Sequence, residues 1–163
     1  MTEPIPSGAE PVPADVLAAV RRVEGSFAKQ AIMRTLGAEL VRVEPGVVEI
    51  GLPVTPGLTQ QHGFVHAGAV ATIADSAAGY AALTRMAEGR GVLTAEFKVN
   101  LVAPAAGERL VAIGTVVKAG RMLTVAETQV FSERIAGDPA TRKLCALLTA
   151  TLVAVENREG VVD

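Results

Sequence analysis

Hydrophobic and polar residues alternate without a break from residue 93 to residue 101. One set of alternate positions carries Leu93, Ala95, Phe97, Val99 and Leu101, and the other carries Thr94, Glu96, Lys98 and Asn100. Because successive side chains of a β-strand point to opposite faces, this period of two predicts a strand with one hydrophobic face and one polar face.

Five further segments also have the pattern of strands. They lie at residues 40–44, 47–54, 110–118, 122–131 and 143–155. Pro45 and Gly46 join the first two segments as a hairpin. The last segment is hydrophobic on both faces and is expected inside the sheet. Long strands that follow one another directly predict an antiparallel sheet.

A long run of Ala, Gly and larger hydrophobic residues, Phe64 to Thr84, separates the hairpin from the later strands. It predicts a helix that is buried on most sides. Asp75 lies in its middle and is the only formally charged side chain between Glu49 and Arg85. The predicted fold class is therefore α+β, with an antiparallel sheet wrapped around one long central helix.

Two short helices are predicted before the sheet, each between a capping residue and a glycine stop. They span residues 16–24, flanked by Asp15 and Gly25, and residues 27–36, flanked by Ser26 and Gly37. Neither carries a recognisable motif, so both are expected to pack against the sheet edge or the entrance to a pocket.

The length of 163 residues suits one domain with one core. Four prolines within residues 1–13 predict a disordered arm. A single domain is expected over residues 14–156 and a C-terminal tail over residues 157–163. Half of the residues are hydrophobic but only 3% are aromatic, so the core is built from Val, Leu, Ile and Ala.

Charge and composition argue against several functions. A formal net charge of −2 leaves no electrostatic footprint for nucleic acid. The first residues carry acids and prolines where a signal peptide needs basic and then hydrophobic residues, which predicts a cytoplasmic protein. The run over residues 64–84 is rich in Ala and Gly and contains Asp75, which argues against a membrane span. Cys145 lies in a hydrophobic run and is expected in the core.

Asp75 is the leading candidate for chemistry, because an ionised carboxylate in a hydrophobic helix needs hydrogen-bond donors or a catalytic role. Its neighbours three and four residues away are small or uncharged, so its partner must come from another element. The start of the same helix has no Ser, Thr, Asp or Asn cap. Peptide N–H groups near Ala67 and Gly68 are therefore expected to be free to bind an electron-rich group.

Helix geometry separates the two candidate groups. His66 and Asp75 are nine positions apart (75 − 66), which corresponds to roughly 13 Å of rise and about half a revolution. One helix cannot easily bring both to one small site. If they act together, the donor end of one helix faces the acid of another chain in a symmetric dimer.

Other kinds of site find little support. His62 and His66 have a spacing that can bind metal, but no third ligand is evident, so no metal is predicted. The chain contains no G-x-S-x-G motif for a nucleophilic serine. Its glycines are scattered rather than gathered in a phosphate-binding loop.

An ordered set of motifs resembles the hotdog-fold acyl-CoA thioesterases of the phenylacetate-degradation (PaaI-like) type. The set comprises Gln60, GFVHAG from Gly63 to Gly68, ATIAD ending at Asp75, Thr94-Ala-Glu96, Val102-Ala-Pro104 and Gly120-Arg121. The resemblance covers roughly residues 38 to 155. It implies a hotdog fold and hydrolysis of an acyl-CoA, with coenzyme A as part of the substrate and no separate cofactor.

Roles follow from the resemblance position by position. Asp75 matches the catalytic acid, which acts as nucleophile or as general base for water. The peptide N–H of Ala67 matches the group that polarises the thioester carbonyl. Gln60 matches an amide, usually Asn, that holds water or the carbonyl, while His66 supports the helix start. Thr94 matches a Ser or Thr near the nucleophile in some members.

The remaining predicted contacts are to substrate. They are Gln61, His62, Gly68, Ser76, Lys118, Gly120 and Arg121, of which Lys118 and Arg121 are candidate phosphate contacts. The resemblance implies a homodimer that often doubles to a homotetramer. Charge and composition predict no nucleic-acid or membrane partner. The alternatives are a hotdog module that binds acyl-CoA without hydrolysis, and a hotdog dehydratase or hydratase.

Overall fold

A computed structural model describes residues 13–156 of the chain. The predicted arm therefore lies outside the described residues except for Pro13, and the predicted tail, residues 157–163, lies outside them entirely.

Six strands form one antiparallel sheet, as the sequence pattern predicts. In chain order they are β1 (Glu39–Glu44), β2 (Val47–Pro53), β3 (Arg90–Leu101), β4 (Arg109–Ala119), β5 (Leu123–Glu133) and β6 (Arg142–Glu156). Their order across the sheet is β1-β2-β4-β5-β6-β3. The hydrophobic last strand, β6, lies between β5 and β3 and is an interior strand as expected, while β1 and β3 form the edges.

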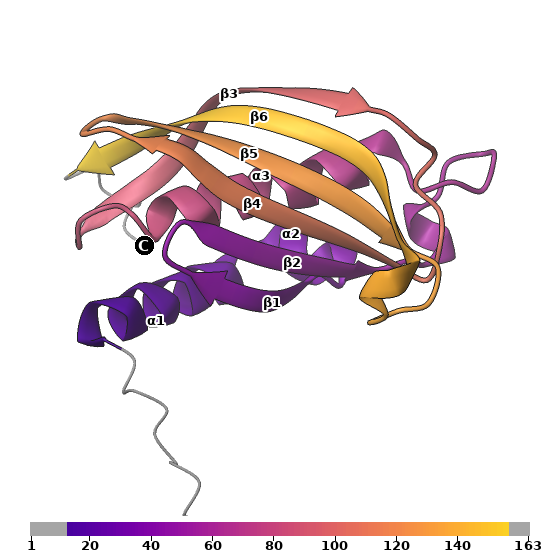
Figure 1. Ribbon diagram of the computed structural model, residues 1–163, viewed down its shortest axis with the longest axis horizontal. Helices are drawn as coiled ribbons and strands as arrows, with labels where there is room; N and C mark the ends of the chain where they lie inside the picture. The colour runs from indigo at the N-terminus through magenta and orange to yellow at the C-terminus, as the bar shows by residue number, and fades with distance from the viewer. Residues whose placement is uncertain (1–12, 157–163) are drawn as a thin grey trace, which may run out of the picture.

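The long helix α3 (Ala67–Leu83) packs against one face of this sheet, which wraps around it (Figure 1). The helices α1 (Ala14–Lys29) and α2 (Ala31–Leu36) lie beside it near β1. Short 3-10 turns occur at Pro56–Leu58 and Pro139–Thr141. The arrangement confirms the predicted hotdog architecture. No helix within residues 13–156 is long and hydrophobic enough to cross a membrane.

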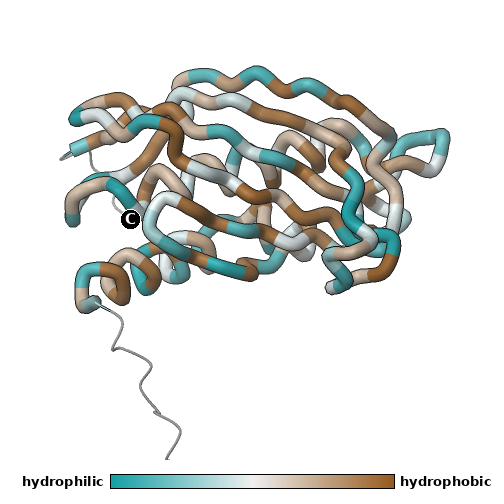
Figure 2. Tube along the Cα trace, viewed as in Figure 1, coloured by the Kyte–Doolittle hydropathy of each residue, from teal (hydrophilic) through white to brown (hydrophobic). Residues whose placement is uncertain are grey.

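The core lies between α3 and the sheet and consists mainly of aliphatic side chains. Ile73, Ala74 and Ala77 of α3 are fully buried against Ile50, Leu110 and other residues of the strands. Hydrophobic and hydrophilic residues alternate along β3 (Figure 2). Cys145 is buried in the core as predicted, and burial raises the pKa of its thiol to about 11, so it is no thiolate nucleophile.

The boundary between the two N-terminal helices differs from the predicted one. A single helix, α1, continues through Gly25 and Ser26, and the break comes at Gln30. Tertiary contacts override the local signals here. Ser26 is buried, and the ring of Phe27 packs on that of Tyr80 with 5.8 Å between the ring centroids. The side-chain oxygen of Gln30 accepts hydrogen bonds from the hydroxyls of Ser76 and Tyr80, which holds the break. Gly37 ends α2 in a left-handed conformation, as predicted.

The regular alternation predicted for residues 93–101 is interrupted by a β-bulge at Ala95. Thr94 pairs with Leu152 and Phe97 with Ala150, so both side chains face α3. Glu96 pairs with Thr151 on the outer face. The prediction that Thr94 lies on the face opposite Phe97 is therefore wrong, because the extra residue shifts the pleat.

Gly114 allows α3 to approach the sheet closely. A Cβ atom at this position of β4 would lie 2.3 Å from the carbonyl oxygen of Ala77 and 2.7 Å from the peptide nitrogen of Ala78. Both are backbone atoms that cannot rotate away. Gly114→Ala should therefore lower the free energy of unfolding by about 2 to 3 kcal/mol or more, as measured by chemical denaturation.

Gly25→Ala is a matched control for this substitution, because nothing lies within 4 Å of a Cβ at that helical position. It should raise the free energy of unfolding by about 0.5 to 1 kcal/mol. Equal effects of the two substitutions would show that α3 and β4 do not approach as closely as the structure indicates.

Candidate active site

The start of α3 is capped by a histidine. His66 adopts an extended conformation, and its Nδ1 atom accepts a hydrogen bond of 2.9 Å from the peptide N–H of Gly68. The prediction of two free N–H groups is therefore wrong for Gly68, because an imidazole can cap a helix in place of Ser or Asp. The N–H of Ala67 has no acceptor among the described residues, and Ala67 is exposed.

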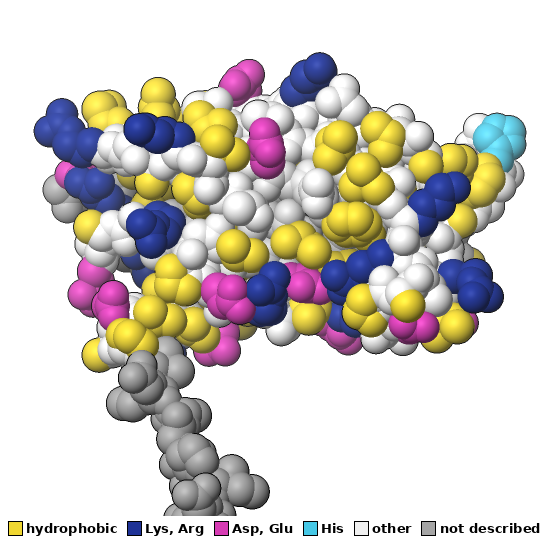
Figure 3. All heavy atoms as spheres, viewed as in Figure 1, with side chains coloured by type: hydrophobic (Ala, Val, Ile, Leu, Met, Phe, Trp, Pro, Cys, Tyr) yellow, Lys and Arg dark blue, Asp and Glu magenta, His cyan; other side chains and the backbone are white. Residues whose placement is uncertain are grey.

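A tight loop before α3 carries the two predicted glutamines and His62. The peptide nitrogen of Gln60 donates to the carbonyl of Phe64 at 2.8 Å, and Gly63 turns the chain with a φ of 83°. The Oε1 atom of Gln60 accepts from the peptide N–H of His62 at 2.6 Å. The amide nitrogen of Gln60 has no acceptor among residues 13–156 and is therefore a free donor. The loop projects from the end of the molecule where α3 begins (Figure 1), and Figure 3 shows histidine colour at its tip.

A cavity of about 570 Å³ lies between this loop and the segment that follows β3. The hydrogen bond from the N–H of Val65 to the carbonyl of Ala105 ties the two walls together at 2.9 Å. Predicted residues on its wall are Gln60, Gln61, His62, His66 and Ala67. The cavity therefore places the free N–H donor of the helix start beside amide and imidazole groups.

Asp75 lies on α3 away from this cavity, and its partner comes from another element, the strand β3. The hydroxyl of Thr94 donates to Oδ1 of Asp75 at 2.8 Å. The bulge at Ala95 makes this contact possible because it turns Thr94 toward α3. The prediction that no helical neighbour would satisfy the carboxylate is confirmed.

Partial burial raises the pKa of Asp75 above its usual range, and the hydrogen bond from Thr94 lowers it only in part. No cation pairs with this carboxylate among the ion pairs of residues 13–156. A carboxylate of raised pKa without a permanent ion pair is suited to accept a proton or to attack an electrophile.

The other predicted substrate contacts lie apart from the N–H donor of Ala67 and from the carboxylate of Asp75. Ser76 is buried and donates to Gln30 at 3.4 Å. Lys118, Gly120 and Arg121 are exposed at the turn between β4 and β5, at the opposite end of the sheet from the projecting loop (Figure 1). Within the described residues, no group of three or more His, Cys, Asp or Glu side chains could hold a metal ion.

Comparison with known proteins identifies the family. The family model of the thioesterase superfamily matches residues 62–136. A crystal structure of a thioesterase family protein from Silicibacter pomeroyi is 47% identical to this chain. The match covers 85% of this chain and 99% of that protein, with a TM-score of 0.81. The chain belongs to the thioesterase superfamily. This membership confirms the prediction of a thioester hydrolase.

More distant structures share the fold of this thioesterase. The E. coli PaaI protein from the phenylacetic acid degradation operon is 18% identical, with a TM-score of 0.77, and the match covers 92% of this chain and all of that one (100%). A thioesterase from Haemophilus influenzae is 21% identical, with a TM-score of 0.72 and coverage of 83% and 90%. The predicted likeness to PaaI is thus confirmed at the level of the fold. A comparison with curated protein sequences gives no match.

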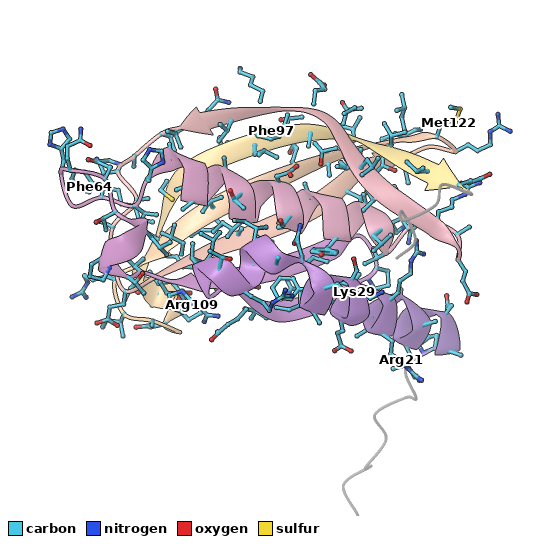
Figure 4. All side chains as sticks on the ribbon, turned by 180° about the vertical axis from the view of Figure 1, so that it is seen from behind. Arg21, Lys29, Phe64, Phe97, Arg109 and Met122 are labelled. Carbon is cyan, nitrogen blue, oxygen red and sulfur yellow. The ribbon has the colours of Figure 1, made fainter. Side chains whose placement is uncertain are left out.

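Sequence analysis missed the hydrophobic side of the thioesterase's cavity. Phe64, Leu101 and Val102 line it and are 38%, 53% and 53% exposed. Figure 4 shows Phe64 in the projecting loop and Phe97 on β3 alongside α3. The signal available in the sequence was Leu101-Val102-Ala103 directly before Pro104, a hydrophobic run that continues beyond the end of the strand.

Proposed function

We propose that the protein hydrolyses acyl-CoA thioesters to a free acid and CoA. The observation that carries this proposal is that one helix presents both a free N–H donor and a carboxylate that pairs with no cation among residues 13–156. The N–H of Ala67 at the start of α3 is an unused donor, and Asp75 is a carboxylate of raised pKa in its middle. A thioester carbonyl that is attacked needs one donor for its oxygen and one base or nucleophile for its carbon.

In the general-base route, Asp75 takes a proton from water while the water oxygen bonds to the thioester carbon. The carbonyl oxygen becomes an oxyanion that the N–H of Ala67 stabilises, and the start of α3 adds its dipole. The C–S bond then breaks, and the CoA thiolate leaves and takes up a proton. In the nucleophilic route, a carboxylate oxygen of Asp75 bonds to the same carbon, CoA leaves, and water hydrolyses the resulting anhydride.

Two copies of the chain would build each site. Asp75 does not line the cavity that holds Ala67, and about 13 Å of helix separates it from the helix start. On the edge strand β3, the side chains of Phe97 and Leu101 face the side of α3 and are 44% and 53% exposed. The unpaired peptide groups of this edge favour pairing with another strand. A second copy on this edge, in a dimer that can double to a tetramer, would cover Asp75 and bring its own helix start toward it.

A thiol-release assay over short, medium, long and aryl acyl-CoAs tests the proposed hydrolysis. We expect turnover of at least one class with release of equal amounts of acid and CoA. Tight acyl-CoA binding without thiol release would instead support a non-hydrolytic binding protein. Water addition to an enoyl-CoA, seen as loss of its conjugated absorbance, would support a hydratase.

Thr94 is a positioning residue for Asp75 in this mechanism. Thr94→Val removes the hydroxyl that donates to Oδ1 of Asp75, so the pKa of this carboxyl should rise further. Activity requires the ionised carboxylate, and the acidic limb of the pH–rate profile should therefore move to higher pH.

Thr94→Ser retains the donor and is the matched control for this prediction. Its pH–rate profile should coincide with that of the wild type. An unchanged acidic limb in Thr94→Val would show that the hydroxyl does not tune the catalytic carboxyl.

A further inference from the structure

A second cavity lies at the opposite end of α3 from the proposed thioester site. It has a volume of about 810 Å³ and lies between α1 and the loop that follows α3. The 17 residues of α3 put roughly 25 Å between this cavity and the helix start. None of the residues assigned to hydrolysis lines it.

The lining of this cavity carries an excess of positive charge. Its cations come from both walls, Arg21, Arg22 and Lys29 from α1 and Arg85 from the loop, whereas Asp15 and Glu88 are the only acids among the described residues that line it. Four cations against two acids give a formal charge of +2 (4 − 2) in a chain whose net charge is −2. Several Lys and Arg side chains also gather at this end of the face in Figure 3.

Three of these cations have no ion-pair partner among residues 13–156. Arg42, Arg90, Arg109 and Arg142, elsewhere in the molecule, all pair with glutamates. Arg21, Lys29 and Arg85 form none of these pairs. Like charges held around one cavity repel each other, and an anion between them would remove that repulsion.

Arg22 holds the two walls at a fixed separation. Its guanidinium donates to the carbonyl oxygens of Met86 at 3.0 Å and Ala87 at 3.1 Å, and also to that of Arg90. These bonds join α1 to the loop and to the first residue of β3, and they occupy three carbonyl oxygens that would otherwise repel an anion.

We propose that this cavity binds a diphosphate ester. Its volume exceeds what a single phosphate needs and suits a nucleotide, whose diphosphate would lie between Lys29 on one wall and Arg85 on the other. Flexible ammonium and planar guanidinium groups are the side chains that bind phosphate oxygens in proteins. The diphosphate can belong to a free nucleotide or to the nucleotide part of CoA.

Binding of ADP and of CoA, measured by calorimetry at low salt, tests the site. The double variant Lys29→Gln/Arg85→Gln removes one cation from each wall. Arg134→Gln/Lys143→Gln removes the same charge from exposed positions outside the cavity and is the matched control. We expect the cavity variant to weaken ADP binding at least about tenfold, the control to change it less than about twofold, and salt to weaken binding in both.

Kinetics separate the two sources of the diphosphate. A raised KM for acyl-CoA with unchanged kcat in the cavity variant assigns the site to the nucleotide part of the substrate. Weakened ADP binding with an unchanged KM assigns it to a free nucleotide. The binding measurement needs no turnover, so it stands even if the proposed hydrolysis fails. Absence of ADP binding by the wild type at millimolar concentration, or equal binding by the cavity variant and the wild type, would overturn the proposal.

Discussion

Asp75→Asn should lower kcat for thioester hydrolysis by about 10²- to 10⁴-fold, with little change in acyl-CoA binding. The amide can still accept the hydrogen bond that Thr94 now donates to Oδ1, so the local structure should be kept. It can neither take a proton from water nor form an anhydride. Steady-state kinetics together with direct binding of an acyl-CoA would separate the lost step from binding.

The exposed carboxylate of Glu127 provides the control for charge. It lies on the outer face of β5 and pairs with Thr115 and Thr149 across the sheet. Glu127→Gln removes the same charge and should leave kcat unchanged. Wild-type turnover in Asp75→Asn would exclude Asp75 from either catalytic route.

The same substitution should stabilise the fold at neutral pH. Burial raises the pKa of Asp75 in the folded state, so the folded protein binds this proton more tightly than the unfolded chain does. Ionisation of Asp75 therefore costs stability as pH rises from the unfolded pKa through the folded one. The melting temperature of Asp75→Asn should exceed that of the wild type at neutral pH, and the difference should shrink as pH falls below the usual pKa of an aspartic acid.

The architecture could be predicted because the hydrophobic patterns of its strands and central helix extend over long, continuous segments of the sequence. Six strands and one central helix follow from hydrophobic periodicity that extends over many residues, and a small error at an end does not change the fold. The break in the N-terminal helix could not be predicted in this way. Gly25 and Ser26 have the local chemistry of a helix boundary, but the packing of Phe27 on Tyr80 continues the helix past them.

The sequence allowed the residues of the candidate site to be predicted more fully than their arrangement in space. The isolation of Asp75 in the sequence pointed to a partner from elsewhere, but the unbroken alternation of residues 93–101 put Thr94 on the wrong face. Only the pairing of β3 with β6 reveals the bulge at Ala95 that turns Thr94 toward α3. His66 is a second example, because the capping preference of short polar residues gives no reason to expect an imidazole cap.

Ala67→Pro should lower kcat by about 10²- to 10³-fold without loss of the fold. Ala67 is the first residue of α3, where proline is well tolerated, and the φ of −62° and ψ of 137° at His66 suit a residue that precedes proline. The substitution therefore removes the proposed oxyanion donor and leaves the helix in place. Ala67→Gly, which keeps the N–H, should retain turnover, and equal losses in both variants would exclude the donor role.

This variant also tests whether two chains share each site. Dimers of either variant alone, Ala67→Pro or Asp75→Asn, should be nearly inactive. A mixed dimer has one site in which the donor of the Asp75→Asn chain and the carboxylate of the Ala67→Pro chain are both intact. If equal amounts of the two subunits assemble at random, half of the dimers are mixed. Each mixed dimer has one active site of its two, so co-expression should restore about a quarter of wild-type turnover. Activity no higher than the mean of the two parents would place the donor and the carboxylate of each site in a single chain.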